Sequence, residues 1–192
     1  MKTTAIFAEL LVGGLLATTW LLLLVMAVAG PDETITALRQ LGVGVGMLGL
    51  AYAYTSGVVL DRLWKRLTAG KSKTIKARVF GEEDPQAVRR LVTQAWVEVG
   101  RDETHTNWVN YMQSRMRVAR AGFFNMILIT AAALLLILWQ YEGIGSGIFW
   151  LVAVVGSWLS RVCWQAFEGL REDYYQTLKL ADEELKRNPI RR

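Results

Sequence analysis

Residues 5–29 read AIFAELLVGGLLATTWLLLLVMAVA, and this stretch decides the fold class of the chain. Glu9 is its one charged side chain. A helix needs about 20 predominantly apolar residues to cross the hydrocarbon core of a bilayer. Three further stretches, 35–60, 121–141 and 147–167, have the same length and character. We therefore expect an all-α, polytopic membrane protein with four transmembrane helices.

The positive charges of the 192-residue chain are strongly segregated. Residues 61–120 hold thirteen Lys and Arg and residues 168–192 hold six, whereas the turns at 30–34 and 142–146 hold none. Basic residues near the ends of spans concentrate on the cytoplasmic side. The pattern predicts an inner (plasma) membrane protein with both termini in the cytoplasm. The single cysteine, Cys163, agrees with a reduced compartment.

These boundaries divide the chain into four parts. We expect a transmembrane hairpin over 1–60, a basic cytosolic helical module over 61–120, a second hairpin over 121–167, and a cytosolic helical extension over 168–192. The two cytosolic parts would form a collar on a homo-oligomer.

Local signals set the elements of the basic module. Asp84-Pro85 predicts a capped helix start and Gly100 a helix end. The alternation over 75–79 permits a short strand. In the extension, apolar residues recur at steps of 4, 4, 3 and 4, which predicts a coiled-coil-like seam. Its members are Leu170, Tyr174, Leu178, Ala181 and Leu185.

The glycine-rich stretch 41–50, LGVGVGMLGL, lies inside the second predicted span. A phosphate loop would open a soluble helix beside basic or hydroxyl side chains, and a potassium filter would follow a pore helix. Small residues four apart instead predict close helix packing in lipid. The partner is either span one of the same chain or span two of a neighbour. The packing residues are Gly42, Gly46, Gly49, Ala53 and Gly57, with Gly156 and Ser160 in span four.

Polar side chains inside the spans are costly and mark functional sites by default. Glu9, Asn125 and Arg161 fall at similar depth near the predicted cytoplasmic face, and Ser157 flanks them. They are candidates for a pore or gate, with Glu9 and Arg161 paired across helices. The alternative is that Glu9 sits in the interface and Arg161 snorkels to the headgroups.

A basic run, SRMRVARAG at 114–122, directly precedes span three. It is either an ordinary topology signal or an anion site for lipid headgroups, a nucleotide or an oligonucleotide. The candidate ligand-binding residues are Arg115, Arg117, Arg120, Arg89, Arg90, Lys73, Lys76 and Arg78.

Catalytic chemistry is not indicated. His105 is the one histidine, and no nucleophile, base and orienting group occur in a recognisable set. We expect no enzyme activity, no metal and no cofactor.

The whole-chain pattern resembles small four-span bacterial membrane effectors of antiphage systems, such as the channel-forming effector of Hailong-type systems. The resemblance rests on the four spans, on SRMRVARAGFFN at 114–125 and on LREDYYQTLKLADEELKR at 170–187. It covers the architecture of the chain and carries over no functional residue. It implies a channel held shut by a nucleic-acid oligomer, in antiviral defence.

The expected function is a homo-oligomeric channel or membrane-perturbing effector, gated by an anionic cytosolic ligand. The alternatives are a non-catalytic scaffold that anchors a cytosolic protein partner, and a proton-coupled small transporter in which Glu9 faces a cavity.

Overall fold

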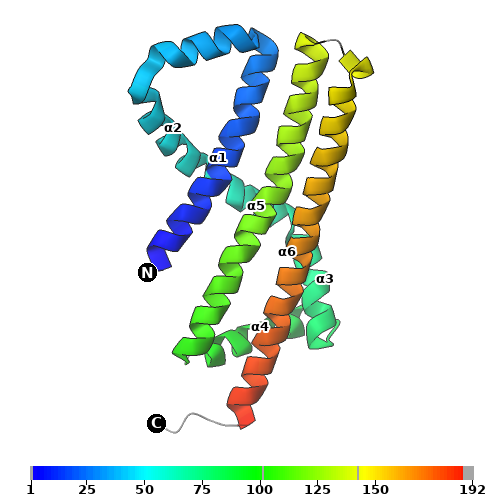
Figure 1. Ribbon diagram of the computed structural model, residues 1–192. Coiled ribbons are helices and arrows are strands. Elements are labelled where there is room, and N and C mark those ends of the chain that lie inside the picture. Colours follow the sequence, from blue (N-terminus) through cyan, green and yellow to red (C-terminus); the bar gives the residue numbers. More distant parts are fainter. Residues whose placement is uncertain (1, 101, 142, 188–192) are drawn as a thin grey trace. The chain divides into compact units, whose positions relative to one another are not determined.

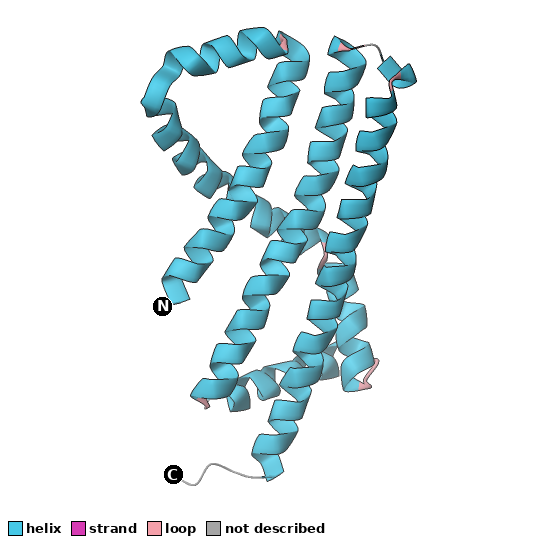
Figure 2. Ribbon diagram, in the orientation of Figure 1, coloured by secondary structure: helices cyan, strands magenta, loops and turns pink. Residues whose placement is uncertain are grey.

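The structure, a computed structural model, describes residues 2–100, 102–141 and 143–187. The side chains of 2–5, 41–47, 103, 104, 143 and 185 lie outside this description. The described residues form helices joined by short turns, without a strand (Figure 2). The expected all-α class is therefore confirmed.

Six α-helices and one 3₁₀ turn follow one another in these ranges (Figure 1). They are α1 (Lys2–Ala29), α2 (Pro31–Leu67), α3 (Ala69–Phe80), α4 (Pro85–Val99), α5 (Glu103–Gln140), η1 (Gly143–Gly145) and α6 (Gly147–Arg187).

Three helices in the described ranges are long and apolar enough to cross a membrane. These segments are Ile6–Ala29 in α1, His105–Gln140 in α5 and Gly147–Glu184 in α6. The predicted second span, 35–60, lies within the 37-residue α2, which is not among the three. The four-span count and the orientation of the termini stay predictions.

The chain divides into two compact units. The first combines Met1–Trp64 with Arg117–Gln165, and the second combines Lys65–Met116 with Ala166–Arg192. Helices α5 and α6 are each divided between the units, with one part of the helix in the first unit and the other part in the second.

Small residues bring α1 and α2 of the first unit into backbone contact. A Cβ on Gly14 would lie 1.5 Å from the carbonyl oxygen of Ala53, and one on Gly57 would lie 2.0 Å from that of Leu10. Only residues without a side chain allow this approach, which maximises van der Waals contact between the helices. In Figure 1, α2 follows an arc and its second half crosses α1. The partner of Ala53 and Gly57 is thus span one of the same chain.

The other predicted packing residues divide into three cases. Gly156 packs on α5, since its Cβ would lie 2.1 Å from Oγ1 of Thr130. Ser160 is buried and donates a hydrogen bond to the Gly156 carbonyl at 2.8 Å. Gly49 faces open space. Gly42 and Gly46 lie outside the described side chains.

The second unit has its own hydrophobic core. Residues from α3, α4, α5 and α6 meet in it, namely Ile75, Ala95, Val99, Val109, Met112, Tyr174, Tyr175, Leu178 and Ala181. Asp84 caps α4 as predicted, accepting hydrogen bonds from the backbone N–H groups of Gln86 and Ala87. Gly100 follows the last residue of α4, also as predicted.

One expectation for this unit is wrong. The segment predicted as a short strand is part of α3, because Ile75 and Val79 are four apart and pack on the core as one helical face. The predicted seam on α6 does form a packed apolar face, and its helical partners are α3, α4 and α5 of the same chain. Tyr174, Leu178 and Ala181 are 3%, 0% and 4% exposed, because they fill the core of their own chain.

Candidate functional site

Two charge pairs lie inside the first unit. Arg117 Nη1 on α5 donates to Glu9 Oε2 on α1 at 3.4 Å. Three residues further along α5, Arg120 Nη2 donates to Asp61 Oδ1 on α2 at 2.5 Å. Each pair neutralises its own charge, so the unit holds polar groups among apolar helices without a net local charge.

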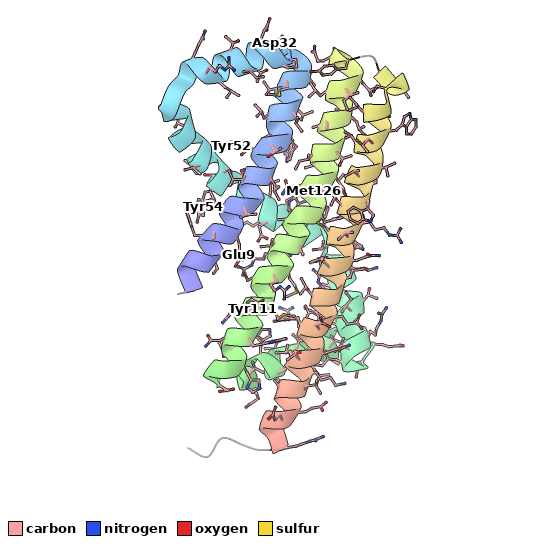
Figure 3. All side chains as sticks on the ribbon, in the orientation of Figure 1. Glu9, Asp32, Tyr52, Tyr54, Tyr111 and Met126 are labelled. Atoms are coloured by element: carbon pink, nitrogen blue, oxygen red, sulfur yellow. The ribbon has the colours of Figure 1, made fainter. Side chains whose placement is uncertain are left out.

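Helical spacing explains why these side chains converge. On α5, residues 117, 120, 121, 124 and 125 recur at steps of three and four and therefore share one face. Gly57, Asp61 and Trp64 share a face of α2 for the same reason. In Figure 3 the side chain of Glu9 lies on the side of α1 that faces α5.

Burial differs between the four charged side chains. Glu9 and Arg120 retain 8% and 9% of their side-chain surface, whereas Asp61 and Arg117 retain 25% and 32%. Each buried member thus has a partner of opposite charge that is better hydrated. Arg120 Nε is buried and makes no hydrogen bond within the described part of the chain, so Asp61 supplies most of the compensation for that guanidinium.

Asn125 completes the cluster and is fully buried. Its Nδ2 donates to the carbonyl oxygens of Ala121 at 2.9 Å and Gly13 at 3.3 Å, and its Oδ1 accepts from Trp20 Nε1 at 3.2 Å. A buried amide needs such partners because an unsatisfied one would lose its hydration without compensation. Asn125 therefore ties α5 to α1.

The residues of the cluster enclose a cavity of about 10 Å³, lined among others by Glu9, Gly13, Asp61, Arg117 and Asn125. Such a volume holds one water at most. On the neighbouring side, the rings of Trp64 and Phe124 stack with centroids 4.3 Å apart. The cluster is a packed polar junction between three helices, with no room for a nucleotide.

The pore or gate candidates separate into two groups. Glu9 and Asn125 belong to the polar junction, whereas Ser157 and Arg161 are exposed on α6. The sequence analysis had offered a pair between Glu9 and Arg161. In the structure the carboxylate of Glu9 pairs with Arg117 instead. Sequence reasoning passed over Asp61 and Trp20. The sequence did contain a signal for Asp61. A carboxylate one turn beyond the Gly57 packing position is placed to enter a helix interface.

The candidate anion-binding residues differ in their surroundings. Arg117 and Arg120 are engaged by carboxylates. Arg115 lies over the ring of Tyr111, 5.5 Å from its centroid, and Lys76 lies 5.4 Å from that of Tyr175. Lys73 and Arg78 are exposed on α3, and Arg89 and Arg90 are exposed on α4.

Arg89 and Arg90 do share one surface hollow. The other lining residues, all on α4, are Gln86, Thr93, Gln94, Val97 and the carboxylate residue Glu98. Among the predicted anion ligands, this is the pair that remains both exposed and adjacent.

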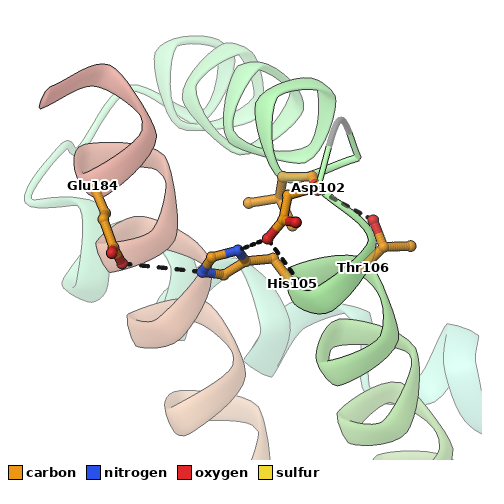
Figure 4. A network of polar contacts seen from close by, with 5 residues as sticks. Asp102, His105, Thr106 and Glu184 are labelled. Atoms are coloured by element: carbon orange, nitrogen blue, oxygen red, sulfur yellow. Dashed lines mark hydrogen bonds and ion pairs between the residues drawn. The ribbon is translucent and has the colours of Figure 1, made fainter. Parts of the chain in front are cut away.

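A separate polar network lies in the second unit (Figure 4). The imidazole of His105 has Asp102 against Nδ1 and the Glu184 carboxylate 4.0 Å from Nε2. Thr106 Oγ1 donates to the Val99 carbonyl at 3.1 Å, which links the start of α5 to the end of α4. Within the described ranges, no group of three or more His, Cys, Asp or Glu residues is arranged to hold a metal ion.

Burial raises the pKa of Tyr174 in this unit to about 12, although a hydrogen bond from Gln113 Nε2 at 3.2 Å works in the opposite direction. The phenol is therefore neutral at physiological pH.

Comparison of the chain with protein-family models, with curated protein sequences and with solved structures finds no match.

Proposed function

We propose that the protein is a four-span, homo-oligomeric membrane channel or membrane-perturbing effector whose conducting state is set by an anionic cytosolic ligand. The observation that carries the proposal is the polar junction, in which Glu9 and Asp61 meet Arg117 and Arg120 among apolar helices. Glu9 lies inside the first predicted span, and Asp61, Arg117 and Arg120 lie at the ends of the second and third. Ionisable groups inside spans are costly and mark functional sites by default.

The size of the junction favours an oligomeric pore. Its cavity of about 10 Å³ leaves no passage for ions through the junction itself. A pathway would then run between copies, and the junction would act as a gate that changes how the helices of each copy pack.

The ligand would bind the second unit. Arg89 and Arg90 on α4, with Lys73 and Arg78 on α3, present exposed positive charge there. A nucleotide or oligonucleotide that binds one packing arrangement better than another shifts the population toward that arrangement. Because α5 and α6 belong to both units, they provide the covalent connection through which such a shift reaches the junction.

Conductance tests this proposal. The purified protein is reconstituted in planar bilayers at low salt, and current is recorded with and without nucleotides and short oligonucleotides. We expect current that changes with one of these ligands, and expect Arg89→Gln/Arg90→Gln to weaken the ligand effect. A monomeric mass in nanodiscs together with no current in any condition would refute the channel.

A membrane scaffold is the second candidate. The exposed face of α4 favours it, because the hollow beside Arg89 also includes Val97, which is 56% exposed. It predicts stable co-purification with a cytosolic protein, loss of that protein on Val97→Asp, and no conductance.

A further inference from the structure

A long groove runs along the first unit between α5 and α6. Its volume is about 720 Å³, within the range of sites that take small molecules. The lining is mainly apolar and aromatic, with one guanidinium. The residues are Phe123, Ile127, Thr130, Ala131 and Leu134 on α5, and Ser157, Trp158, Ser160, Arg161 and Trp164 on α6.

The two ends of the groove differ in chemistry. The Phe123 and Trp164 rings meet at one end with centroids 4.7 Å apart, and Arg161 lies one helical turn before Trp164. Further along, Gly156 packs on Thr130, and beyond this contact Leu134 extends the apolar wall of α5. A cation and an indole therefore mark one end, and hydrocarbon side chains line the rest.

This polarity matches a phospholipid in one leaflet. From Phe123 to Leu134 the groove extends eleven residues, or about 16 Å at 1.5 Å per residue. Half of a bilayer core of about 30 Å is nearly the same length. Tryptophan favours the level of the headgroups, and an arginine at that level reaches phosphate oxygens with a planar pair of donors.

The positive charge of Arg161 favours an anionic occupant. Arg117 and Arg120 are paired with carboxylates, whereas Arg161 forms no ion pair within the part of the chain that the structure describes. The groove around it is open to the surroundings of the helices, since Trp158 is 61% and Ile127 is 42% exposed. A lipid phosphate would supply the missing negative partner without another protein.

We propose that the groove between α5 and α6 binds one anionic phospholipid per chain, with its phosphate on Arg161 and an acyl chain along Ile127, Ala131 and Leu134. The proposal rests on the membrane-embedded placement in the proposed function, and is independent of whether the protein conducts ions.

Native mass spectrometry tests it on the full chain, released from phosphatidylglycerol or phosphatidylcholine nanodiscs. We expect one retained phosphatidylglycerol per chain, and about tenfold weaker retention for Arg161→Gln, the loss typical of one charge-assisted contact. The matched control is Arg62→Gln, which removes an exposed arginine of α2 in the same unit and should retain the lipid. Ala131→Trp, which fills the groove from an exposed position, should displace the lipid while Arg161 is intact.

Several outcomes would overturn the lipid site. Equal retention by Arg161→Gln and wild type would do so, as would equal loss in Arg62→Gln or equal binding of phosphatidylcholine. Competition by inorganic phosphate alone would assign the site to a free anion. A cysteine placed at Ala131 could also cross-link to a second copy with no lipid retained. That outcome would show that the groove is an interface between copies of the chain. Release of the chain from membranes by alkaline carbonate would instead refute the membrane placement on which both proposals rest.

Discussion

Arg120 Nη2 on α5 lies 2.5 Å from Oδ1 of Asp61 on α2, and the arginine side chain is 9% exposed. This contact joins α2, which is not among the three long apolar helices of the described ranges, to α5, which is. The pair therefore does more than neutralise charge, because it fixes which face of α2 meets α5.

Removal of the carboxylate should be costly. Asp61→Ala leaves a buried guanidinium without its partner, and we expect about 3 kcal/mol of lost stability, the lower end of the range for buried pairs because Asp61 keeps 25% of its side-chain surface exposed. Thermal unfolding in detergent measures the effect. The double variant Asp61→Ala/Arg120→Leu removes both charges and should recover most of the loss. Equal loss in the single and double variants would contradict this account.

Helix contact at Gly57 gives a second prediction. Gly57→Ala places a Cβ 2.0 Å from the Leu10 carbonyl oxygen, and a backbone atom cannot move aside by rotation of a side chain. We expect the helices to separate and stability to fall by roughly 1–3 kcal/mol, as for overpacked cores.

Gly49→Ala is the matched control for Gly57→Ala. It lies on the same helix but faces open space, so alanine should leave stability unchanged or raise it by up to about 1 kcal/mol through helix propensity. If the two variants melt at the same temperature, close packing of α1 on α2 is not what selects glycine at position 57.

Glu9→Gln separates the functional hypotheses. The amide keeps the shape of the side chain but removes the charge that pairs with Arg117 at 3.4 Å. For a gated channel we expect the ligand concentration for half-maximal current to shift about fivefold or more, the lower end of typical coupling between sites. A transporter should lose proton-coupled exchange outright, and a scaffold should show neither change. Glu33→Gln, at an exposed carboxylate near the start of α2, should leave the current unaffected.

Tyr174 predicts how the second unit responds to alkali. Its folded-state pKa is about 12 against about 10 for an exposed tyrosine, so folding favours the protonated form. The stabilisation is complete below pH 10 and is lost as pH rises from about 10 through about 12, approaching 1.4 kcal/mol per pH unit.

Circular dichroism melts at pH 9 and pH 11 measure the Tyr174 contribution. Tyr174→Phe should flatten this part of the dependence, because the variant has no proton to lose. Tyr111→Phe, at an exposed tyrosine of α5, should keep the wild-type slope. An unchanged slope in Tyr174→Phe would assign the alkaline transition to another group.

Local chemistry made the helical elements predictable. Asp84-Pro85 and Gly100 mark the two ends of α4 because caps act within a few residues. The strand expected near Ile75 failed because three alternating residues also fit a helical face, and burial against α6 decides between the two periods.

The junction was only partly accessible from sequence. Glu9, Asn125, Arg117 and Arg120 stand out by type and position, yet their pairing depends on which faces of α1, α2 and α5 meet. For α1 and α2, the close backbone contact between Gly14 and Ala53 determines which faces meet. From sequence alone, Arg117 and Arg120 were either a topology signal or candidate ligand-binding residues, because the sequence could not show that Glu9 and Asp61 face them.

The core of the second unit has a consequence for synthesis on the ribosome. Val99 and Leu178 lie against the same core, although segment 117–165 of the first unit is made between them. At roughly 5–20 residues per second, translation from Val99 to Leu178 adds 79 residues and takes about 4–16 s. During that interval the apolar faces of α3 and α4 lack the cover that Tyr174, Leu178 and Ala181 of α6 provide. Completion of this unit must therefore wait for the late-emerging part of α6, after the helices of the first unit have been made.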